Sequence, residues 1–156
     1  FITIVRYVAM DSPDFYETKP PLAALSAEEW EQLCDGCGRC CYRTFVIGRG
    51  KHEKNVATRI ACDLLDMQTE KCTAYADRFK VNKDCIRLTK NNVGKCDWLP
   101  QTCAYRLRYY KRPLPDWHPL VSGCAESVQE AGIPIQNGVH ECDAGDEWER
   151  FAIGES

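Results

Sequence analysis

The chain has 156 residues, of which 44% are hydrophobic and 28% charged, and a formal net charge of −3. This is the composition of a globular domain, and it excludes disordered, collagen-like and low-complexity chains. No apolar run approaches the ~18–20 residues that a membrane-spanning helix needs. A chain of this length buries roughly 68–70% of its unfolded surface, so its eleven cysteines are not needed to staple a small core.

The chain begins with Phe1 instead of Met. Removal of a targeting peptide produces such an end. Together with cysteines suited to a reducing compartment, it predicts a protein of the mitochondrial matrix, with the bacterial cytoplasm as the alternative. We predict an N-terminal extension over residues 1–12 and one metal-binding domain over residues 13–153, with an acidic C-terminal segment from about residue 125.

The first helix signal is the segment Ser26-Ala-Glu-Glu29. It has the pattern of a capping box, in which the Ser26 side chain accepts a bond from the Glu29 amide and the Glu29 side chain accepts one from the Ser26 amide. The helix that it opens is predicted to carry Trp30 and Leu33 into the core.

The helix signals further along the chain are shorter. A cap at Asn82 or Asp84 predicts a second helix, and Thr102 predicts a third that ends before Pro113. Residues 43–62 suit a short hairpin or loop. We therefore predict a small, irregular, α-rich domain with a minor α+β character, rich in cysteine and organised around metal centres.

Four cysteines fall within the eight residues Cys34–Cys41, which form a CxxCxxCC string. Adjacent cysteines cannot form an ordinary disulfide, and an odd total leaves one thiol over, so metal ligation is favoured over a disulfide framework. Two-residue spacers let a tight turn present successive thiolates to one metal. Adjacent side chains diverge, so Cys40 and Cys41 are predicted to serve different centres.

Two four-thiolate centres would use eight of the eleven cysteines. Thiolate-only ligation suits both Zn²⁺ and an iron–sulfur cluster. Structural zinc prefers paired CxxC knuckles, whereas here single cysteines follow one dense string. That spacing favours an iron–sulfur cluster, with zinc as the alternative.

These motifs resemble the YcgN-like CxxCxxCC cysteine-cluster family, whose members are described as zinc- or iron-chelating. The resemblance runs from about Pro13 to Ile153 and lies in the segments Leu25–Trp30, Cys34–Cys41, Ala61–Leu65, Cys72–Tyr75, Arg78–Phe79, Asp84–Thr89, Trp98–Arg106 and Leu114–Leu120. The family pattern implies eight metal ligands: Cys34, Cys37, Cys40, Cys41, Cys62, Cys72, Cys85 and Cys103. Cys96, Cys124 and Cys142 lie outside it and are interpreted as buried filler.

Charge is unevenly distributed: residues 78–112 are basic and residues 125–156 are acidic. Tyrosines lie among the cations, which is one pattern of a surface that binds RNA phosphates. The candidate contacts are Arg87, Lys90, Arg106, Arg108, Lys111 and Arg112. The alternative is a set of ordinary solvated charges.

No nucleotide-binding, nucleophile-elbow or zinc-protease motif is present, and no small-molecule substrate is evident. His118 is the one histidine considered as a ligand, against a structural role. The sequence predicts a non-catalytic metal-binding subunit of a larger assembly, ribosomal or respiratory, with other protein subunits and RNA as its candidate partners. An iron–sulfur redox enzyme or electron carrier and an RNA-binding module are the alternatives.

Overall fold

The computed structural model describes residues 25–155, so the predicted extension over residues 1–12 lies outside them. The contacts divide the chain into two compact units. Of the described residues, the first unit contains 25–37, Thr89–Lys95 and Gln101–Ile133; the second contains Gly38–Leu88, Cys96–Pro100 and 134–155. The CxxCxxCC string therefore begins in the first unit and ends in the second.

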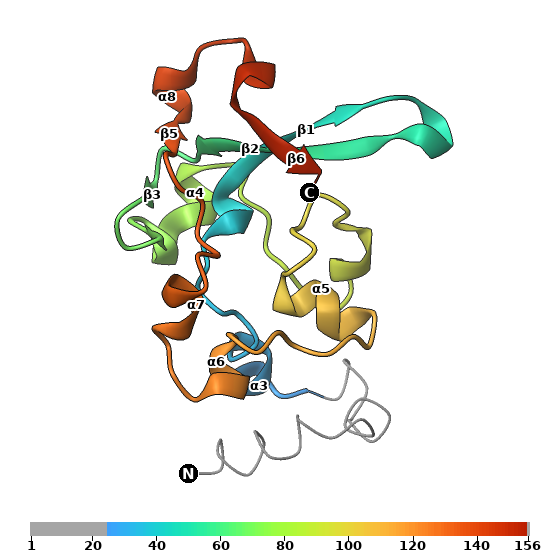
Figure 1. The fold of residues 1–156 in the computed structure, drawn as a ribbon, viewed down its shortest axis with the longest axis vertical. Coiled ribbons are helices and arrows are strands. Elements are labelled where there is room, and N and C mark those ends of the chain that lie inside the picture. Colours follow the sequence, from blue (N-terminus) through green and yellow to red (C-terminus); the bar gives the residue numbers. More distant parts are fainter. Residues whose placement is uncertain (1–24, 156) are drawn as a thin grey trace. The chain divides into compact units, whose positions relative to one another are not determined.

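The second unit contains a small sheet (Figure 1). Strands β1 (Tyr42–Ile47) and β2 (Lys54–Ala61) make an antiparallel hairpin, which confirms the hairpin predicted over residues 43–62. The strand β5 (Val139–His140) runs parallel to β2, and β6 (Ala152–Glu155) runs antiparallel to it. The central strand of the sheet is therefore β2.

Strand β2 buries alternate residues, because successive side chains of a strand point to opposite faces. Val56, Thr58 and Ile60 are buried in this way, and Ile60 is fully buried. The register with β1 shifts between Tyr42 and Thr44. At this shift the Thr58 hydroxyl donates a 2.7 Å hydrogen bond to the Arg43 carbonyl and accepts one of 3.1 Å from the Ile60 amide. The Thr58 side chain thus makes hydrogen bonds in place of the strand-to-strand backbone bonds that the register shift removes.

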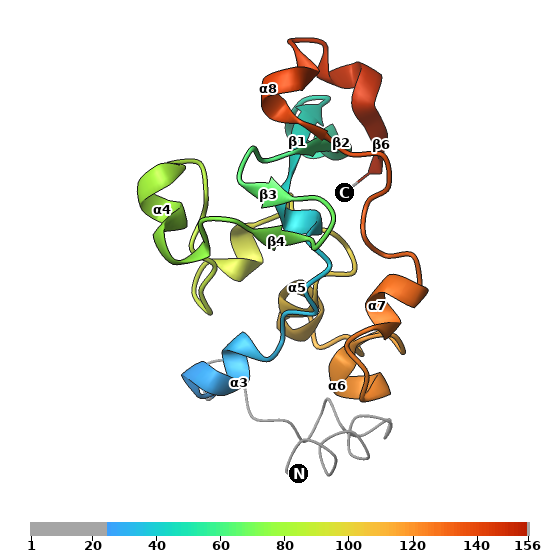
Figure 2. The ribbon, with the colours of Figure 1, turned by 90° about the vertical axis from the view of Figure 1, so that its left-hand side faces the viewer.

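Short elements complete the second unit. Strands β3 (Leu65–Asp66) and β4 (Lys71–Cys72) form a two-stranded ribbon, seen most clearly in Figure 2. The helices are η2 (Arg39–Cys41), η3 (Gly50–His52), η4 (Tyr75–Asp77), α4 (Arg78–Val81), α8 (Glu141–Ala144) and η6 (Trp148–Phe151). Tyr42, Ala61 and Leu65 form a buried cluster, against which Cys41 packs.

The first unit is built from α3 (Ala27–Glu31), η5 (Val93–Lys95), α5 (Ala104–Tyr109), α6 (Pro119–Ser122) and α7 (Ser127–Glu130). Both hydrogen bonds of the predicted capping box are present at the start of α3. Trp30 is buried and its ring lies 4.5 Å from that of Tyr105, centroid to centroid. Leu33 is also buried, which confirms the burial predicted for both residues. The helix itself is shorter than expected, since it ends at Glu31 and does not continue to Cys34. Helix α5 confirms the helix expected after Thr102.

The α-rich fold class is wrong. The α-helices of residues 25–155 have only four to six residues, α5 being the longest, and the most extensive regular structure is the sheet around β2. Isolated helices shorter than ~12–15 residues are marginal in water, so these turns depend on tertiary contacts. The expected organisation around metal centres is also overturned, since the described part of the chain holds no group of three or more His, Cys, Asp or Glu side chains placed to hold a metal ion.

The helix predicted at Asn82 is absent as well. Cys85, Ile86 and Leu88 lie in extended, irregular chain. The Asn82 side chain makes the hydrogen bond of a turn instead of a helix cap: Asn82 Oδ1 accepts a 3.0 Å bond from the Asp84 amide. Asn is favoured both at helix starts and in such turns, and here the turn is formed.

Candidate functional site

The two units divide the predicted ligands between them. Cys34, Cys37 and Cys103 belong to the first unit, whereas Cys40, Cys41, Cys62, Cys72 and Cys85 belong to the second. In the second unit, Cys41, Cys62, Cys72 and Cys85 come from four separate segments, and the first three act electrostatically on Cys85, although no three of the four are placed to hold a metal ion together. We refer to these four residues as the four-thiol group.

Backbone contacts bring the first two of these cysteines together. Cys41 ends the short helix η2, and its carbonyl oxygen accepts a 2.8 Å hydrogen bond from the Cys62 amide. Cys62 follows directly after strand β2. The β1–β2 hairpin therefore positions both residues, one before its first strand and one after its second.

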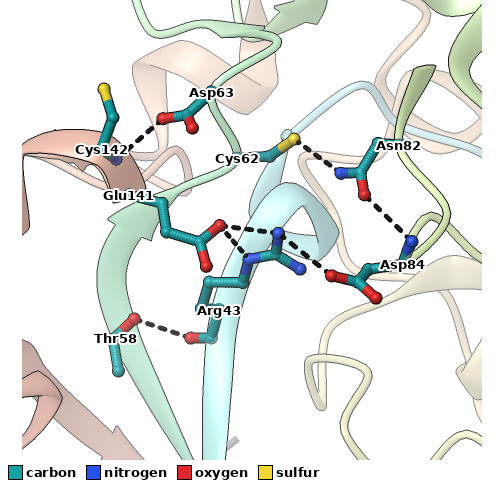
Figure 3. A network of polar contacts seen from close by, with 8 residues as sticks. All are labelled: Arg43, Thr58, Cys62, Asp63, Asn82, Asp84, Glu141 and Cys142. Carbon is teal, nitrogen blue, oxygen red and sulfur yellow. Dashed lines mark hydrogen bonds and ion pairs between the residues drawn. The ribbon is translucent and has the colours of Figure 1, made fainter. Parts of the chain in front are cut away.

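The turn after α4 positions Cys85. Asn82 Nδ2 donates a 3.3 Å hydrogen bond to Cys62 Sγ, and the Cys85 amide donates a 3.1 Å bond to the Asn82 carbonyl oxygen. Figure 3 shows the Asn82 side chain between the Cys62 sulfur and the Asp84 backbone. Asn82 thus links the segment of Cys62 to that of Cys85.

The ribbon of β3 and β4 positions Cys72. Cys72 pairs with Leu65, three residues beyond Cys62, and the Thr73 amide donates a 2.7 Å bond to the Leu64 carbonyl oxygen. The electrostatics agree with this proximity. Burial raises the pKa of Cys85, the Arg78 guanidinium lowers it, and negative charge at Cys41, Cys72 and Cys62 raises it further.

The surroundings of Cys41 lower the pKa of its thiol. A hydrogen bond from the Cys40 side chain lowers the pKa of Cys41 to about 7, against the opposing effects of burial and of Glu70; Arg78 and Arg43 also lower it. The thiolate is the form of cysteine that binds metals. The lowered pKa of Cys41 therefore favours its thiolate form.

A polar network surrounds Arg43, the residue after Tyr42 in β1 (Figure 3). Arg43 Nε donates a 2.8 Å hydrogen bond to Glu141 Oε2, and a more distant ion pair of 3.9 Å joins Arg43 to Asp84. Near it, the Cys142 amide donates a 3.0 Å bond to Asp63 Oδ1. These contacts connect α8 with the segments that carry Cys62 and Cys85.

Glu70 is a buried carboxyl beside the four-thiol group. It is 7% exposed, and its Oε2 has no hydrogen-bond partner among the described residues. Gly38 lies against it, because a Cβ on Gly38 would fall 2.5 Å from Glu70 Oε2. Burial, together with the negative charge of Glu70 and Cys41, raises the pKa of Tyr42 to about 12. The Tyr42 hydroxyl also lacks a partner of ordinary hydrogen-bond geometry among the described residues.

Glu70→Gln is expected to change the pH dependence of stability. Burial raises the pKa of Glu70 above its usual value, partly offset by Tyr42 and supported by Asp66. A carboxyl with a raised folded-state pKa favours folding at low pH, and that contribution is lost as the pH rises through the folded-state value. The free energy of unfolding of the native chain should therefore fall relative to that of Glu70→Gln as the pH rises from about 4.5, the ordinary pKa.

Urea unfolding of both chains between acidic and neutral pH measures this difference. The exposed Glu53 provides the matched control, as Glu53→Gln. Parallel pH profiles for the native chain and Glu70→Gln would contradict the assignment of Glu70 as a charge that is costly to bury.

The first unit places its predicted ligands differently. Cys103 stands at the N-cap of α5. Burial raises the pKa of Cys103, the Arg106 and Tyr105 amides lower it, and charges at Cys34 and Asp35 raise it. Cys34 and Cys103 are thus neighbours within this unit.

The three cysteines outside the family pattern do not share one environment. Cys96 is buried, in agreement with its interpretation as filler. Cys124 and Cys142 are exposed, so that interpretation is wrong for them. The Cys124 thiol donates a 3.0 Å hydrogen bond to Glu126 in the next turn of chain.

The six candidate RNA contacts do not share one unit. Arg87 belongs to the second unit and the other five belong to the first. Arg108 is 3% exposed, so it is not available to a phosphate on the surface. Arg106 and Arg112 lie over the Tyr110 ring, at 6.0 and 5.8 Å from its centroid. The charge pattern of the sequence therefore did not predict that Arg108 is buried.

His118 has a structural role. It is 1% exposed, its Nε2 lies 2.7 Å from the Leu33 carbonyl oxygen, and its Nδ1 accepts a 2.9 Å bond from the Leu120 amide at the start of α6. Both ring nitrogens are therefore engaged with backbone groups of the first unit.

The sequence patterns did not mark Asn82, Glu70 and Arg43 as residues of the candidate site. The Asn-Lys-Asp-Cys segment at residues 82–85 carries the signal for Asn82, because this composition suits an Asx turn as well as a helix cap. Nothing in the sequence marks Glu70 as buried, since glutamate is almost never fully buried without a partner.

Comparison with known proteins gives the family. The chain is 53% identical over 143 residues to a UPF0260 protein of Haemophilus influenzae strain PittEE, covering 92% of this chain and 94% of that relative. A UPF0260 protein of Pasteurella multocida strain Pm70 is 53% identical over 90% of this chain and 94% of its own, and one of Rhizorhabdus wittichii is 47% identical over 87% and 91%. The chain belongs to the UPF0260 protein family.

No protein-family model and no solved structure matches the chain. The relatives named above come from bacteria, which gives no support to the mitochondrial location expected from the first residue. Within residues 25–155, no helix is long and apolar enough to cross a membrane.

Proposed function

We propose that the protein binds a metal through the four-thiol group. The observation that carries this proposal is that Cys41, Cys62, Cys72 and Cys85 belong to one compact unit, where the first three act electrostatically on Cys85; in the arrangement described they are not placed to hold an ion together. Four thiolates are the donor number of a closed structural zinc site and of an iron–sulfur cluster. The resemblance of the cysteine pattern to the YcgN-like family supports the same chemistry.

The residues match such a group in donor type and number, but no three of the described side chains are placed to hold an ion, so binding would have to bring the four thiols closer together. Cys41 has a pKa of about 7, and the cations Arg43 and Arg78 act on its thiolate, as a site that gathers negative thiolates requires. A bound zinc ion would tie the four segments together, whereas an iron–sulfur cluster would also carry an electron.

The biological role that we propose is that of a non-catalytic metal-binding subunit in the bacterial cytoplasm. The bacterial relatives favour this compartment over mitochondria. The structure directs the search for a partner toward other proteins, since the buried Arg108 and the division of the basic residues between two units weaken the case for one RNA-binding face.

Metal analysis with an absorption spectrum tests the proposal, on full chain purified both with and without oxygen. We expect stoichiometric metal together with a sulfur-to-metal absorption band or, for zinc, a colourless protein with about one zinc per four-thiolate site. Iron with acid-labile sulfide would assign a cluster. Protein that contains neither metal, and takes up neither after reconstitution, would overturn the proposal.

A further inference from the structure

Helix α5 ends on a pair of exposed tyrosines. Tyr109 and Tyr110 are each 45% exposed, and their rings meet edge to face with centroids 5.0 Å apart. A Cβ on Gly94 in η5 would fall 2.3 Å from Tyr109 Cζ, so the Tyr109 ring lies directly against the backbone of η5. Tyr109 is therefore held in place although much of its side chain faces solvent.

Cations flank the two rings. The guanidinium groups of Arg106 and Arg112 lie over the Tyr110 ring, 6.0 and 5.8 Å from its centroid. Lys111 is exposed, as is Arg112. The sequence holds no Asp or Glu within residues 98–115, and in the described part of the chain neither Lys111 nor Arg112 forms an ion pair. We refer to Arg106, Tyr109, Tyr110, Lys111 and Arg112 as the tyrosine–arginine patch.

Lys111 occupies a position that favours glycine. Its φ is +57°, and two hydrogen bonds close the end of α5. The Lys111 amide donates to the Arg108 carbonyl oxygen at 3.2 Å, and the Arg112 amide donates to that of Leu107 at 2.8 Å. This is the Schellman pattern of helix ends, in which the left-handed residue is usually glycine because other residues are strained there. The chain thus carries a cation at this place at the cost of backbone strain.

The patch suits carboxylates better than the bases of a nucleic acid. A guanidinium group binds a carboxylate through two parallel hydrogen bonds, and Tyr and Arg are enriched among the residues that contribute most to protein interfaces. Stacking of a base needs an open aromatic face, whereas guanidinium groups of the chain itself lie over the Tyr110 ring and the Tyr109 ring packs against Gly94. Charge and ring packing together favour an acidic protein segment over single-stranded RNA.

We propose that the tyrosine–arginine patch is a docking surface for an acidic segment of a partner protein. Carboxylates of that segment pair with Lys111 and Arg112, and an apolar side chain packs on the exposed parts of the tyrosine rings. The patch belongs to the first unit and shares no residue with the four-thiol group. The inference extends the proposed function to a kind of partner, and it does not depend on metal binding.

Fluorescence anisotropy of the full chain with a labelled glutamate peptide that carries one central leucine tests the proposal. We expect saturable binding that weakens as salt is added, because exposed charges are screened. A matched peptide with glutamine in place of glutamate should bind more weakly. The double variant Lys111→Gly, Arg112→Gln should lower the affinity for the glutamate peptide at least about 5-fold, as the loss of residues important to an interface does.

The double variant Lys51→Gln, Lys80→Gln is the matched control. It removes the same two positive charges from exposed positions in the second unit, and it should bind the peptide as the native chain does. Lys111→Gly alone relieves the positive φ and should raise Tm by about 2–4 °C. Weaker peptide binding by that variant therefore cannot come from a loss of folding.

Two results would overturn the proposal directly: no saturable binding of the glutamate peptide, or equal affinities of the native chain and the Lys111→Gly, Arg112→Gln variant. Tighter binding of a labelled oligouridine, lost in the same variant, would assign the patch to RNA and overturn the proposal as well. Metal content is measured separately in the same preparations, so the metal function and the docking surface can fail independently.

Discussion

Cys62→Ser is expected to abolish tight metal binding. Cys62 joins β2 to the ribbon of β3 and β4, its backbone bonds to Cys41, and its sulfur accepts the Asn82 amide. A serine hydroxyl is not ionised at neutral pH and is a poor replacement for a soft thiolate. Loss of a ligand should exceed the ~10–100-fold effect of a residue that only supports a ligand, so we expect a fall in affinity of more than about 100-fold.

The same change should lower the thermal stability of the metal-loaded protein. A metal present at 1,000 times its Kd stabilises a folded chain by about 4 kcal/mol. For a chain of this size, each kcal/mol corresponds to about 2–4 °C in Tm. The metal-dependent rise in Tm of the native chain, about 8–16 °C under such conditions, should therefore be absent from Cys62→Ser.

Cys142→Ser is the matched control, because Cys142 is an exposed cysteine of the same unit and lies outside the four-thiol group. Metal content by elemental analysis and Tm with and without metal should stay at native values in this variant. Equal metal content in Cys62→Ser and the native chain would remove Cys62 from the ligand set.

Gly38→Ala is expected to destabilise the protein strongly. Gly38 has φ +73°, and an added Cβ would lie 2.5 Å from Glu70 Oε2 and 3.0 Å from Glu70 Cβ. The left-handed backbone costs an alanine about 1–2 kcal/mol, and overlap in a packed region costs about 1–3 kcal/mol more. Glu70 is buried, so its side chain has little room to move away.

Gly36→Ala separates these two costs. Gly36 has the same φ of +73°, but an added Cβ meets nothing within 4 Å. Urea unfolding should give a loss of about 1–2 kcal/mol for Gly36→Ala and a clearly larger loss for Gly38→Ala. Equal losses would show that the contact between Gly38 and Glu70 does not constrain the chain.

The local signals of the sequence succeeded where the partners lie close in the chain. The capping box of Ser26 and Glu29 needs only one turn of helix, and both of its bonds are present. The β1–β2 hairpin likewise pairs two strands that follow each other directly in the chain. Such features depend on residues a few positions apart, so sequence patterns report them directly.

Predictions failed where one local signal fits two structures. Asn82 suits a helix cap and an Asx turn equally, and its contact with Cys62, twenty residues away, accompanies the turn. Arg108 belongs to a basic run that looks solvated, yet its side chain is buried. In both cases the surroundings of the residue in the folded chain decided the result, as is usual when tertiary packing overrides local preference.

The sequence by itself determined the cysteine pattern of this protein, a dense CxxCxxCC string followed by single cysteines, and this pattern predicts thiolate ligation. Only the tertiary structure decided how these cysteines are grouped. It joins Cys41, Cys62, Cys72 and Cys85 in one unit through the hairpin, the β3–β4 ribbon and the Asn82 turn. The physical reason is that hydrogen bonds between distant segments set which cysteine-bearing segments lie together, and spacing along the chain does not record those bonds.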